Sequence, residues 1–253
     1  MPKVNAERIQ MEEAPAQDSY LLGKRKTLLF DIEGYVDAVP LFLQALEVSA
    51  DNPLVYSAMA ETYSYWGRRR EINGQECLSY YNLAYDYARQ ALSLDPDLSQ
   101  AHRAMAVALR GGEMCDGQAR RTEARRAMEL NPYDGETCWE FWRSHGSGPD
   151  DPIVFKAIVL DPLLCGAQND LGVSLCERGR LDEAVFHLKA ALRLNPRNSL
   201  FQYNLAMVCL RKGLLLDAER ILAAAREMHR DDPLVLSGME LVKAETGEAV
   251  LSA

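Results

Sequence analysis

The sequence predicts an all-α protein built from stacked pairs of helices. Alanine and leucine far outnumber valine and isoleucine, which favours helix over strand. A Leu, Asp or Asn, Pro step closes four apolar helical patterns, at Pro96, Pro132, Pro162 and Pro196. Proline there cannot continue the preceding helix. The segments between these stops have a period close to 34 residues, as expected of a solenoid.

The N-terminal region is expected to hold a tail and one imperfect pair. Residues 1–18 are predicted as the tail and 19–52 as the first pair. The second helix of this pair has a regular apolar face of Ala38, Phe42 and Ala45. Arg25 and Lys26 stand where its first helix should carry packing residues, which predicts a solvated cap or an irregular edge.

Residues 53–98 form the second predicted pair, with a break at Gly67. The packing residues are Tyr56, Met59, Ala60 and Tyr63 before the break, then Ala84, Ala88 and Ala91. The unit has 46 residues, 12 more than the period, so an insertion is placed at 68–81. The insertion is either a partner-specific ledge or an extension of the second helix, and we favour the extension. In that case Tyr80, Tyr81 and Tyr85 would pack on Trp66.

The middle of the chain combines a regular pair with a degenerate one. Residues 99–134 carry helix-spaced apolar residues and two extra residues near Gly111–Gly117. Residues 135–164 are four residues short of the period and break at the His145–Pro149 segment. A shortened second helix and a bend in the stack are expected there.

The most regular pairs are 165–198 and 199–232, each of 34 residues, with breaks at Gly179 and Gly213. Small residues would let the two helices of a pair approach closely, at Gly172, Ala184, Ala206 and Ala218. Residues 233–253 add one more helix that covers the last pair.

The 34-residue period, the small packing residues and the closing proline resemble the tetratricopeptide repeat family. The resemblance is strong over 53–132 and 160–232 and weak over 1–30 and 135–158. It implies a right-handed α-α superhelix of about six helix pairs plus a C-terminal capping helix. It also implies a concave groove that receives a partner peptide or helix.

Composition and charge limit the kinds of partner and the cellular compartment that we expect for this protein. The 28 basic and 37 acidic residues give a formal charge of −9, which disfavours nucleic acid as a partner. The Arg120-Arg121 and Arg125-Arg126 doublets alternate with glutamates at helical spacing, which predicts a solvated helix face. Neither an apolar signal segment nor a membrane-spanning stretch is present, so no membrane insertion is expected. Six cysteines without a CxxC pair predict reduced thiols and a cytoplasmic location.

Catalytic and metal-binding patterns are missing from the sequence. It contains no GxSxG, HExxH or phosphate-binding glycine motif, and its four histidines are dispersed. We therefore predict no enzyme activity, no cofactor and no metal site. The best remaining catalytic candidates, His145 with Asp150 and Asp151, are expected in a loop.

The groove would be lined by the first helix of each pair, on the side opposite its packing partner. The partner-binding residues expected from helical spacing are Tyr65, Arg103, Val107, Arg110, Trp139, Asn169, Val173, Tyr203, Asn204, Met207 and Arg211. Tyr203 and Met207 could instead contact the neighbouring pair. The lysine and asparagine clamp with which some family members hold a chaperone tail is not reproduced here.

Three functions follow in order of preference. The first is a non-enzymatic scaffold or adaptor that binds a protein or peptide in its groove. The second is a scaffold that self-associates within a larger assembly, through the imperfect N-terminal pair or the C-terminal helix. The third is an enzyme with degenerate repeats.

Overall fold

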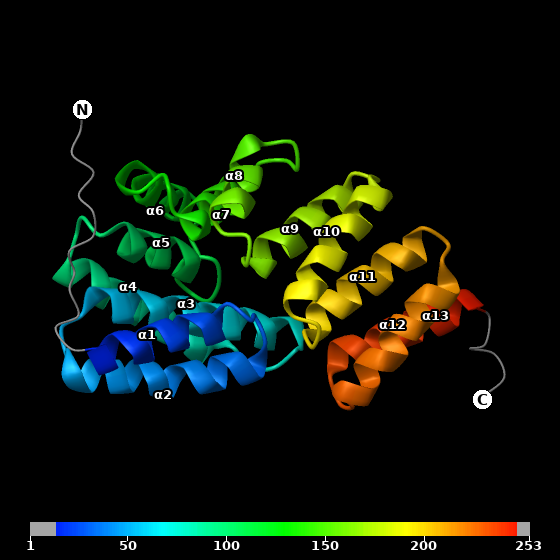
Figure 1. Cartoon of the computed structure of the whole chain (residues 1–253), viewed down its shortest axis with the longest axis horizontal. Coiled ribbons are helices and arrows are strands. Elements are labelled where there is room, and N and C mark those ends of the chain that lie inside the picture. The colour runs from blue at the N-terminus through cyan, green and yellow to red at the C-terminus, as the bar shows by residue number, and fades with distance from the viewer. Residues whose placement is uncertain (1–13, 247–253) are drawn as a thin grey trace.

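The computed structural model describes residues 14–246, which fold into thirteen α-helices (Figure 1). The predicted all-α solenoid of about six helix pairs and a capping helix is confirmed. The helices are α1 (Ala14–Thr27), α2 (Ile32–Val48), α3 (Pro53–Ile72), α4 (Leu78–Leu94), α5 (Ser99–Ala108), α6 (Gly117–Leu130), α7 (Gly135–His145), α8 (Pro152–Leu160), α9 (Cys165–Glu177), α10 (Leu181–Leu194), α11 (Ser199–Arg211), α12 (Leu215–Met228) and α13 (Pro233–Thr246).

The proline steps end the second helices as the sequence predicts. Asp95, Asn131, Asp161 and Asn195 cap α4, α6, α8 and α10, and each backbone N–H donates to the alanine carbonyl four residues earlier. Three first helices, α3, α7 and α11, begin at a side-chain cap, where an Asn or Asp oxygen accepts from a free N–H of the first turn. Local sequence therefore fixes where most helices start and stop.

Small residues allow close packing inside the pairs. A Cβ added at Gly172 of α9 would stand 2.7 Å from Leu188 Cγ of α10. Ala184, Ala206 and Ala218 are fully buried. The α9–α10 interface therefore depends on a position without a side chain.

The 68–81 segment lengthens both helices of its pair. α3 runs on to Ile72, so the break expected at Gly67 is wrong, and the turn lies at Asn73–Gly74, where Gly74 has φ +67°. Gly67 has another role, because a Cβ there would meet Tyr80 Cβ at 3.2 Å across the pair. Tyr80 packs on Trp66 with ring centroids 4.9 Å apart, as expected for a structural extension. Tyr81 instead donates to Glu71 Oε2 at 2.9 Å, and Arg89 lies over the ring of Tyr85.

Two boundary predictions change or stay open. α1 begins at Ala14, so the tail predicted for 1–18 is wrong over its last residues, and Pro15 is tolerated there because the first turn needs no N–H donor. Residues 1–13 and 247–253, the rest of that tail and the end of the predicted cap, lie outside the described part. α8 has only nine residues, in agreement with a shortened second helix. The remaining repeat boundaries stay predictions.

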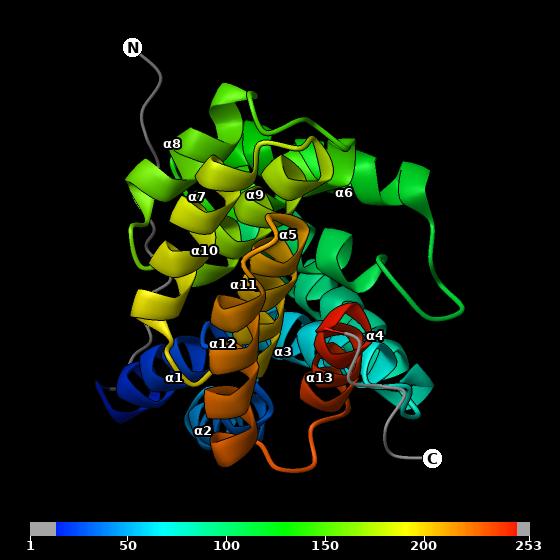
Figure 2. The same ribbon diagram turned by 90° about the vertical axis from the view of Figure 1, so that its right-hand side faces the viewer.

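The two ends of the solenoid meet. Figure 2, with the C-terminal helices toward the viewer, shows α11 and α12 in front, α1 and α2 below and α7 and α8 above. The long α3 carries Arg69 to the starts of α11 and α13, where Arg69 Nη2 lies 2.8 Å from Asp232 Oδ2 and also contacts Ser199. Among the helices of residues 14–246, none is long and apolar enough to cross a bilayer.

Candidate functional site

The predicted groove is partly filled by the chain itself. The turn after α1 inserts Phe30 between two aromatic rings of the inner faces of α3 and α7. Its ring centroid lies 5.1 Å from that of Tyr65 and 5.4 Å from that of Trp139, both in edge-on geometry. Phe30 adopts φ +56°, a left-handed conformation that only a tightly determined site holds for a bulky residue. The first half of the groove is therefore closed.

A buried cluster of charges holds α1 in this position. Lys24 Nζ lies 3.0 Å from Glu61 Oε2 and 2.7 Å from Glu136 Oε2. Arg103 Nε lies 2.6 Å from Glu61 Oε1, and the same guanidinium contacts Asp134 and Glu136. Burial acts to raise the pKa of Glu61, but Arg103 and Lys24 outweigh it and lower that pKa. For Glu136 burial dominates, and its pKa is raised.

Two asparagines hold the extended turn from the other side. Asn195 Nδ2 donates to the Leu29 carbonyl at 2.8 Å, and Asn198 Nδ2 donates to the Leu29 and Phe30 carbonyls at 3.0 and 2.9 Å. Both asparagines belong to the turn between α10 and α11. The solenoid thus binds a segment of its own backbone through side-chain amides.

The structure buries five of the predicted groove residues, four of them beneath α1 and Phe30. Tyr65, Arg103, Val107 and Trp139 do not face an open groove, because α1 and Phe30 cover the inner faces of α3, α5 and α7. Asn169 is buried as well. It donates to Asp170 and accepts from Asn204 Nδ2 at 2.8 Å. Helical spacing predicts that these residues lie on the inner faces of the first helices. It does not predict that α1 and Phe30 cover those faces.

The remaining predicted residues lie on surface that is at least partly open. Arg110, Val173, Tyr203, Asn204 and Met207 are half-buried, and Arg211 is exposed. The Tyr203 ring lies 3.1 Å from a Cβ built at Gly238 of α13, and Met207 packs against the core, so both contact neighbouring elements. Arg211 Nη1 donates to the Cys176 carbonyl at 2.8 Å. Their part in binding stays a prediction.

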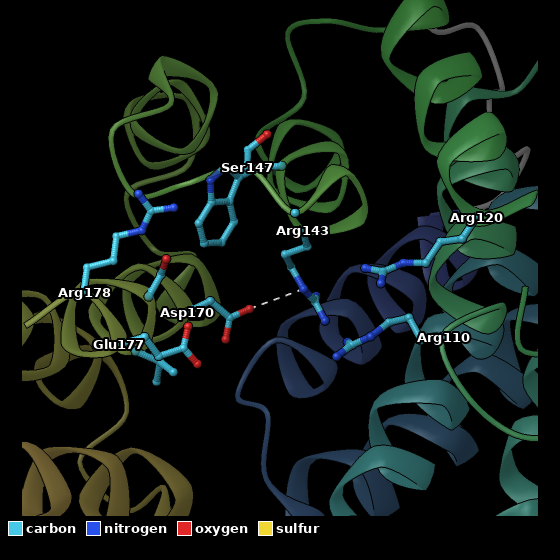
Figure 3. A pocket seen from close by; sticks show the side chains of 11 residues that line it. Arg110, Arg120, Arg143, Ser147, Asp170, Glu177 and Arg178 are labelled. Atoms are coloured by element: carbon cyan, nitrogen blue, oxygen red, sulfur yellow. Dashed lines mark ion pairs between the residues drawn. The ribbon is translucent and has the colours of Figure 1, made fainter. Parts of the chain in front are cut away.

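A cavity of about 370 Å³ opens between α5–α7 and α9 (Figure 3). It includes Arg110 and Val173 from the predicted set and joins them to residues of α6, α7 and the turn that follows. The lining residues are Arg110, Arg120, Trp142, Arg143, Gly146, Ser147, Asp170, Val173, Ser174, Glu177 and Arg178.

Arginines dominate one wall of this cavity. Arg120 donates from Nε and Nη2 to Glu140 Oε1 at 2.9 and 2.8 Å. Arg143 stacks over the Trp139 ring at 4.3 Å, and its Nε lies 3.3 Å from Asp170 Oδ2. Arg110 and Arg178 form no ion pair with any residue of the described chain. Figure 3 shows the guanidinium groups of Arg110, Arg120 and Arg143 close together.

A buried carboxyl group lies behind the arginine wall. Burial raises the pKa of Glu140 to about 7, against the opposing effect of Arg120. Its Oε2 accepts no hydrogen bond, and Arg143 Nη1, 3.5 Å away, donates none. The guanidinium of Arg143 thus lies between the carboxyl groups of Glu140 and Asp170, and its Nη1 forms an ion pair without a hydrogen bond.

Catalytic groups do not converge within the described residues. No group of three His, Cys, Asp or Glu side chains in residues 14–246 could hold a metal ion. His145 stacks on Phe141 at 4.0 Å, Asp150 pairs with Arg180 at 2.5 Å, and Asp151 caps α8. These three residues therefore have separate structural contacts. Asp150 and Asp151 lie in the loop before α8 as expected, but the loop predicted for His145 is wrong, because His145 is the last residue of α7.

Sequence reasoning missed Arg120, Arg143 and Arg178 as cavity residues. Arg120 was assigned to a solvated face, and this is wrong, because Glu140 on the next helix draws its side chain inward. In the sequence, nothing distinguishes the inward-pointing Arg120 from its neighbour Arg121. Arg143 follows Trp139 by four residues on α7, a helical spacing that is compatible with the observed stacking.

Comparison with known proteins agrees with this architecture. Residues 175–241 match the family model of the tetratricopeptide repeat. No curated protein sequence matches the chain significantly. The human IFIT1 dimer with PPP-AAAA is similar in structure, with a TM-score of 0.63 and 18% identity over 93% of this chain and 54% of that chain. The chain thus spans about half of IFIT1.

Two smaller solved structures are also similar. YrrB, described as a TPR protein with an unusual peptide-binding site, has a TM-score of 0.47 and 19% identity over 79% of this chain and 97% of that chain. MamA from Desulfovibrio magneticus RS-1 has a TM-score of 0.48 and 16% identity over 68% of this chain and 96% of that chain. Residues 175–241 thus match the tetratricopeptide repeat, and the stacked helix pairs of residues 14–246 have the fold of such repeats.

Proposed function

We propose that this chain is a non-enzymatic scaffold that binds a protein or peptide partner on the part of its inner surface left open by α1. The observation that carries the proposal is the arginine-lined cavity, which opens beside the half-exposed faces of α9 and α11. Polar and apolar side chains lie together there, as in surfaces that bind peptides. The IFIT1 structure holds PPP-AAAA, but a likeness at 18% identity extends to the fold only.

Site-specific crosslinking tests this function. A photoreactive benzoylphenylalanine placed at Met207 should give discrete adducts with one or a few proteins in extract of the native cells, identified by mass spectrometry. The control position is Leu216 of α12, which is 81% exposed and lies away from the inner surface of α9 and α11. If both positions give the same adducts, or neither gives any, the proposed binding surface is wrong.

Self-association is a second candidate, favoured by an apolar face on α8. Phe155, Val159 and Leu163 expose 44%, 78% and 74% of their surface, although they lie within or directly after one short helix. Light scattering over a concentration series should then show a dimer that Val159→Glu converts to a monomer. A monomer at every concentration of the unmodified chain would exclude this candidate.

A cytoplasmic location is part of the same proposal. All six cysteines are unpaired, and four of them are buried among apolar side chains. Unpaired thiols are the usual state in a reducing compartment. Mass spectrometry of the protein after thiol labelling in intact cells tests the location, since a disulfide between any two of them would contradict it.

A further inference from the structure

We infer that the arginine cavity binds a carboxylate group of an acidic peptide. The inference rests on the proposed function and names the chemistry of the partner. Four guanidinium groups from four different elements meet around one space of about 370 Å³, although the chain as a whole carries a charge of −9. A local excess of positive charge on an acidic protein selects an anionic ligand.

The decisive side chain is Arg143. Its side chain is 9% exposed and lines the cavity, and its Nε pairs with Asp170. Its buried Nη1 lies 3.5 Å from Glu140 Oε2 but forms no hydrogen bond. Buried donors in folded proteins almost always form a hydrogen bond, so one that does not points to a ligand. Stacking on Trp139 at 4.3 Å fixes the plane of this guanidinium before any ligand arrives.

Arg110 and Arg178 supply the uncommitted charge. Arg110 follows α5 and Arg178 caps α9, so the two come to the cavity from its two walls. Neither forms an ion pair with the described part of the chain. Arg120 is occupied by Glu140, which makes Arg110 the free arginine on the side of Arg143 in Figure 3.

The opposite wall favours a carboxylate over a phosphate. Asp170 and Glu177 of α9 line the same cavity and would repel a phosphate group that carries about two charges. A carboxylate carries one charge, and the planar guanidinium matches it with two parallel hydrogen bonds. The backbone N–H groups of a bound peptide can donate to Asp170 and Glu177, which are otherwise unfavourable for an anion.

Fluorescence anisotropy with labelled peptides tests the inference. The probe is an octapeptide with alternating glutamate and leucine, acetylated and amidated at its ends, and its counterpart carries glutamine in place of glutamate. We expect the full-length protein to bind the glutamate peptide at least tenfold more tightly, because tenfold corresponds to about 1.4 kcal/mol, the scale of one charge-assisted hydrogen bond.

Variants locate the binding. Arg110→Gln and Arg178→Gln should each weaken binding of the glutamate peptide by about fivefold or more. Arg125→Gln is the matched control, because it removes an exposed arginine of α6 that does not line the cavity. Both cavity variants should keep the thermal midpoint of the unmodified protein, since neither arginine forms an ion pair within residues 14–246.

Three outcomes overturn the inference. They are equal binding of the two peptides, equal loss in Arg110→Gln and Arg125→Gln, and displacement of the glutamate peptide by a 5′-phosphorylated oligonucleotide at lower concentration than by unlabelled peptide. The failure of the proposed function is separate. Adducts at Met207 that survive Arg110→Gln would leave the scaffold standing and remove only the carboxylate site. Binding of the glutamate peptide without adducts at Met207 would leave the carboxylate site standing and remove the proposed scaffold function.

Discussion

Five charged side chains meet beside α1, and their mutual pairing makes each of them structural. Lys24 and Arg103 face Glu61, Glu136 and Asp134, and Glu61 and Arg103 are almost completely buried. Such a cluster is weak evidence for net stability, but removing one member leaves the others unpaired in a medium of low polarity. Arg103 is therefore a residue that the fold requires, and it cannot report on a partner.

Replacement of Arg103 should lower the free energy of unfolding of the protein substantially. We expect Arg103→Met to lower the free energy of unfolding by about 3 to 5 kcal/mol, because Glu61 and Asp134 lose their main counter-charge. Urea denaturation at pH 7 measures this loss. Arg125→Met, on the exposed face of α6, should stay within about 0.5 kcal/mol of the unmodified protein. A loss below about 1 kcal/mol in Arg103→Met would contradict the structural role.

Glu140 should make stability depend on pH. Burial raises its pKa from 4.5 to about 7, so between these values the folded protein holds a proton that the unfolded chain has released. Below pH 4.5 the group is protonated in both states, and the protein has its highest stability with respect to Glu140. As pH rises from 4.5 toward 7, the free energy of unfolding falls by about 1.4 kcal/mol per pH unit.

Glu140→Gln isolates this effect, since glutamine is neutral at every pH and has nearly the same shape. We expect the stability of the unmodified protein, relative to Glu140→Gln, to decline between pH 4.5 and about pH 7 and then to level off in urea denaturation series. A difference that is flat across this range, or one that rises with pH, would show that Glu140 is ionised in the folded state.

At the scale of elements, α1 and the turn after it behave as an insert in the solenoid. The turn is held by the aromatic rings of Tyr65 and Trp139 and by the amides of Asn195 and Asn198. Phe30 is 8% exposed and stands in a left-handed conformation. The contributions of its ring and of its backbone conformation to stability can be tested separately.

Two variants of Phe30 separate ring from backbone. Phe30→Ala should cost about 3 to 5 kcal/mol of unfolding free energy, because it empties the space between two rings. Phe30→Gly loses the same ring but accepts the positive φ freely, so it should be more stable than Phe30→Ala by about 1 kcal/mol. Thermal and urea unfolding of both variants measure this order. Glycine less stable than alanine would show that the turn relaxes to another conformation.

The sequence predicts the helix pairs well and the insert poorly, for a physical reason. Pairs such as α9–α10 depend on apolar periodicity and a close approach at Gly172, and both are visible within a few tens of residues. The cover of the groove depends on Phe30 and Lys24, whose partners are dispersed along the chain. Arg25 and Lys26 beside Lys24 indicate a solvated edge, and no local pattern marks Lys24, the first of the three, as the buried one.

The cavity shows the same limit. Arg110 and Val173 were predicted from helical spacing, but Arg143 and Arg178 were not, because one lies in the degenerate pair and the other at a helix end. The predicted groove was assumed continuous along all first helices. The structure leaves only its later part open.

At the scale of the molecule, the solenoid is joined at its ends. A solenoid whose repeats contact only their neighbours can unfold in sections. Here Arg69 of α3 contacts Ser199 and Asp232, which lie 130 and 163 residues further along the chain. The C-terminal helices are thus coupled to the N-terminal ones by direct contacts.

Loss of Arg69 should free the C-terminal helices. We expect Arg69→Met to raise amide hydrogen exchange in α11 and α13 by about tenfold or more, while exchange in α5 and α7 stays unchanged. Arg68→Met is the control, because Arg68 is an exposed neighbour whose ion pair among residues 14–246 is with Glu71, within α3. Equal exchange in the two variants would show that the ends are held by other contacts.

The asparagine clamp on the turn after α1 also sets an order in time. Leu29 and Phe30 leave the ribosome early, yet Asn195 and Asn198, which bind their carbonyls, are made 166 to 169 residues later. At about 5 to 20 residues per second, that delay is roughly 10 to 30 seconds. During synthesis these carbonyls must be hydrated, and water leaves them only when the tenth helix has been translated. The turn is among the first segments made and among the last to reach its final contacts.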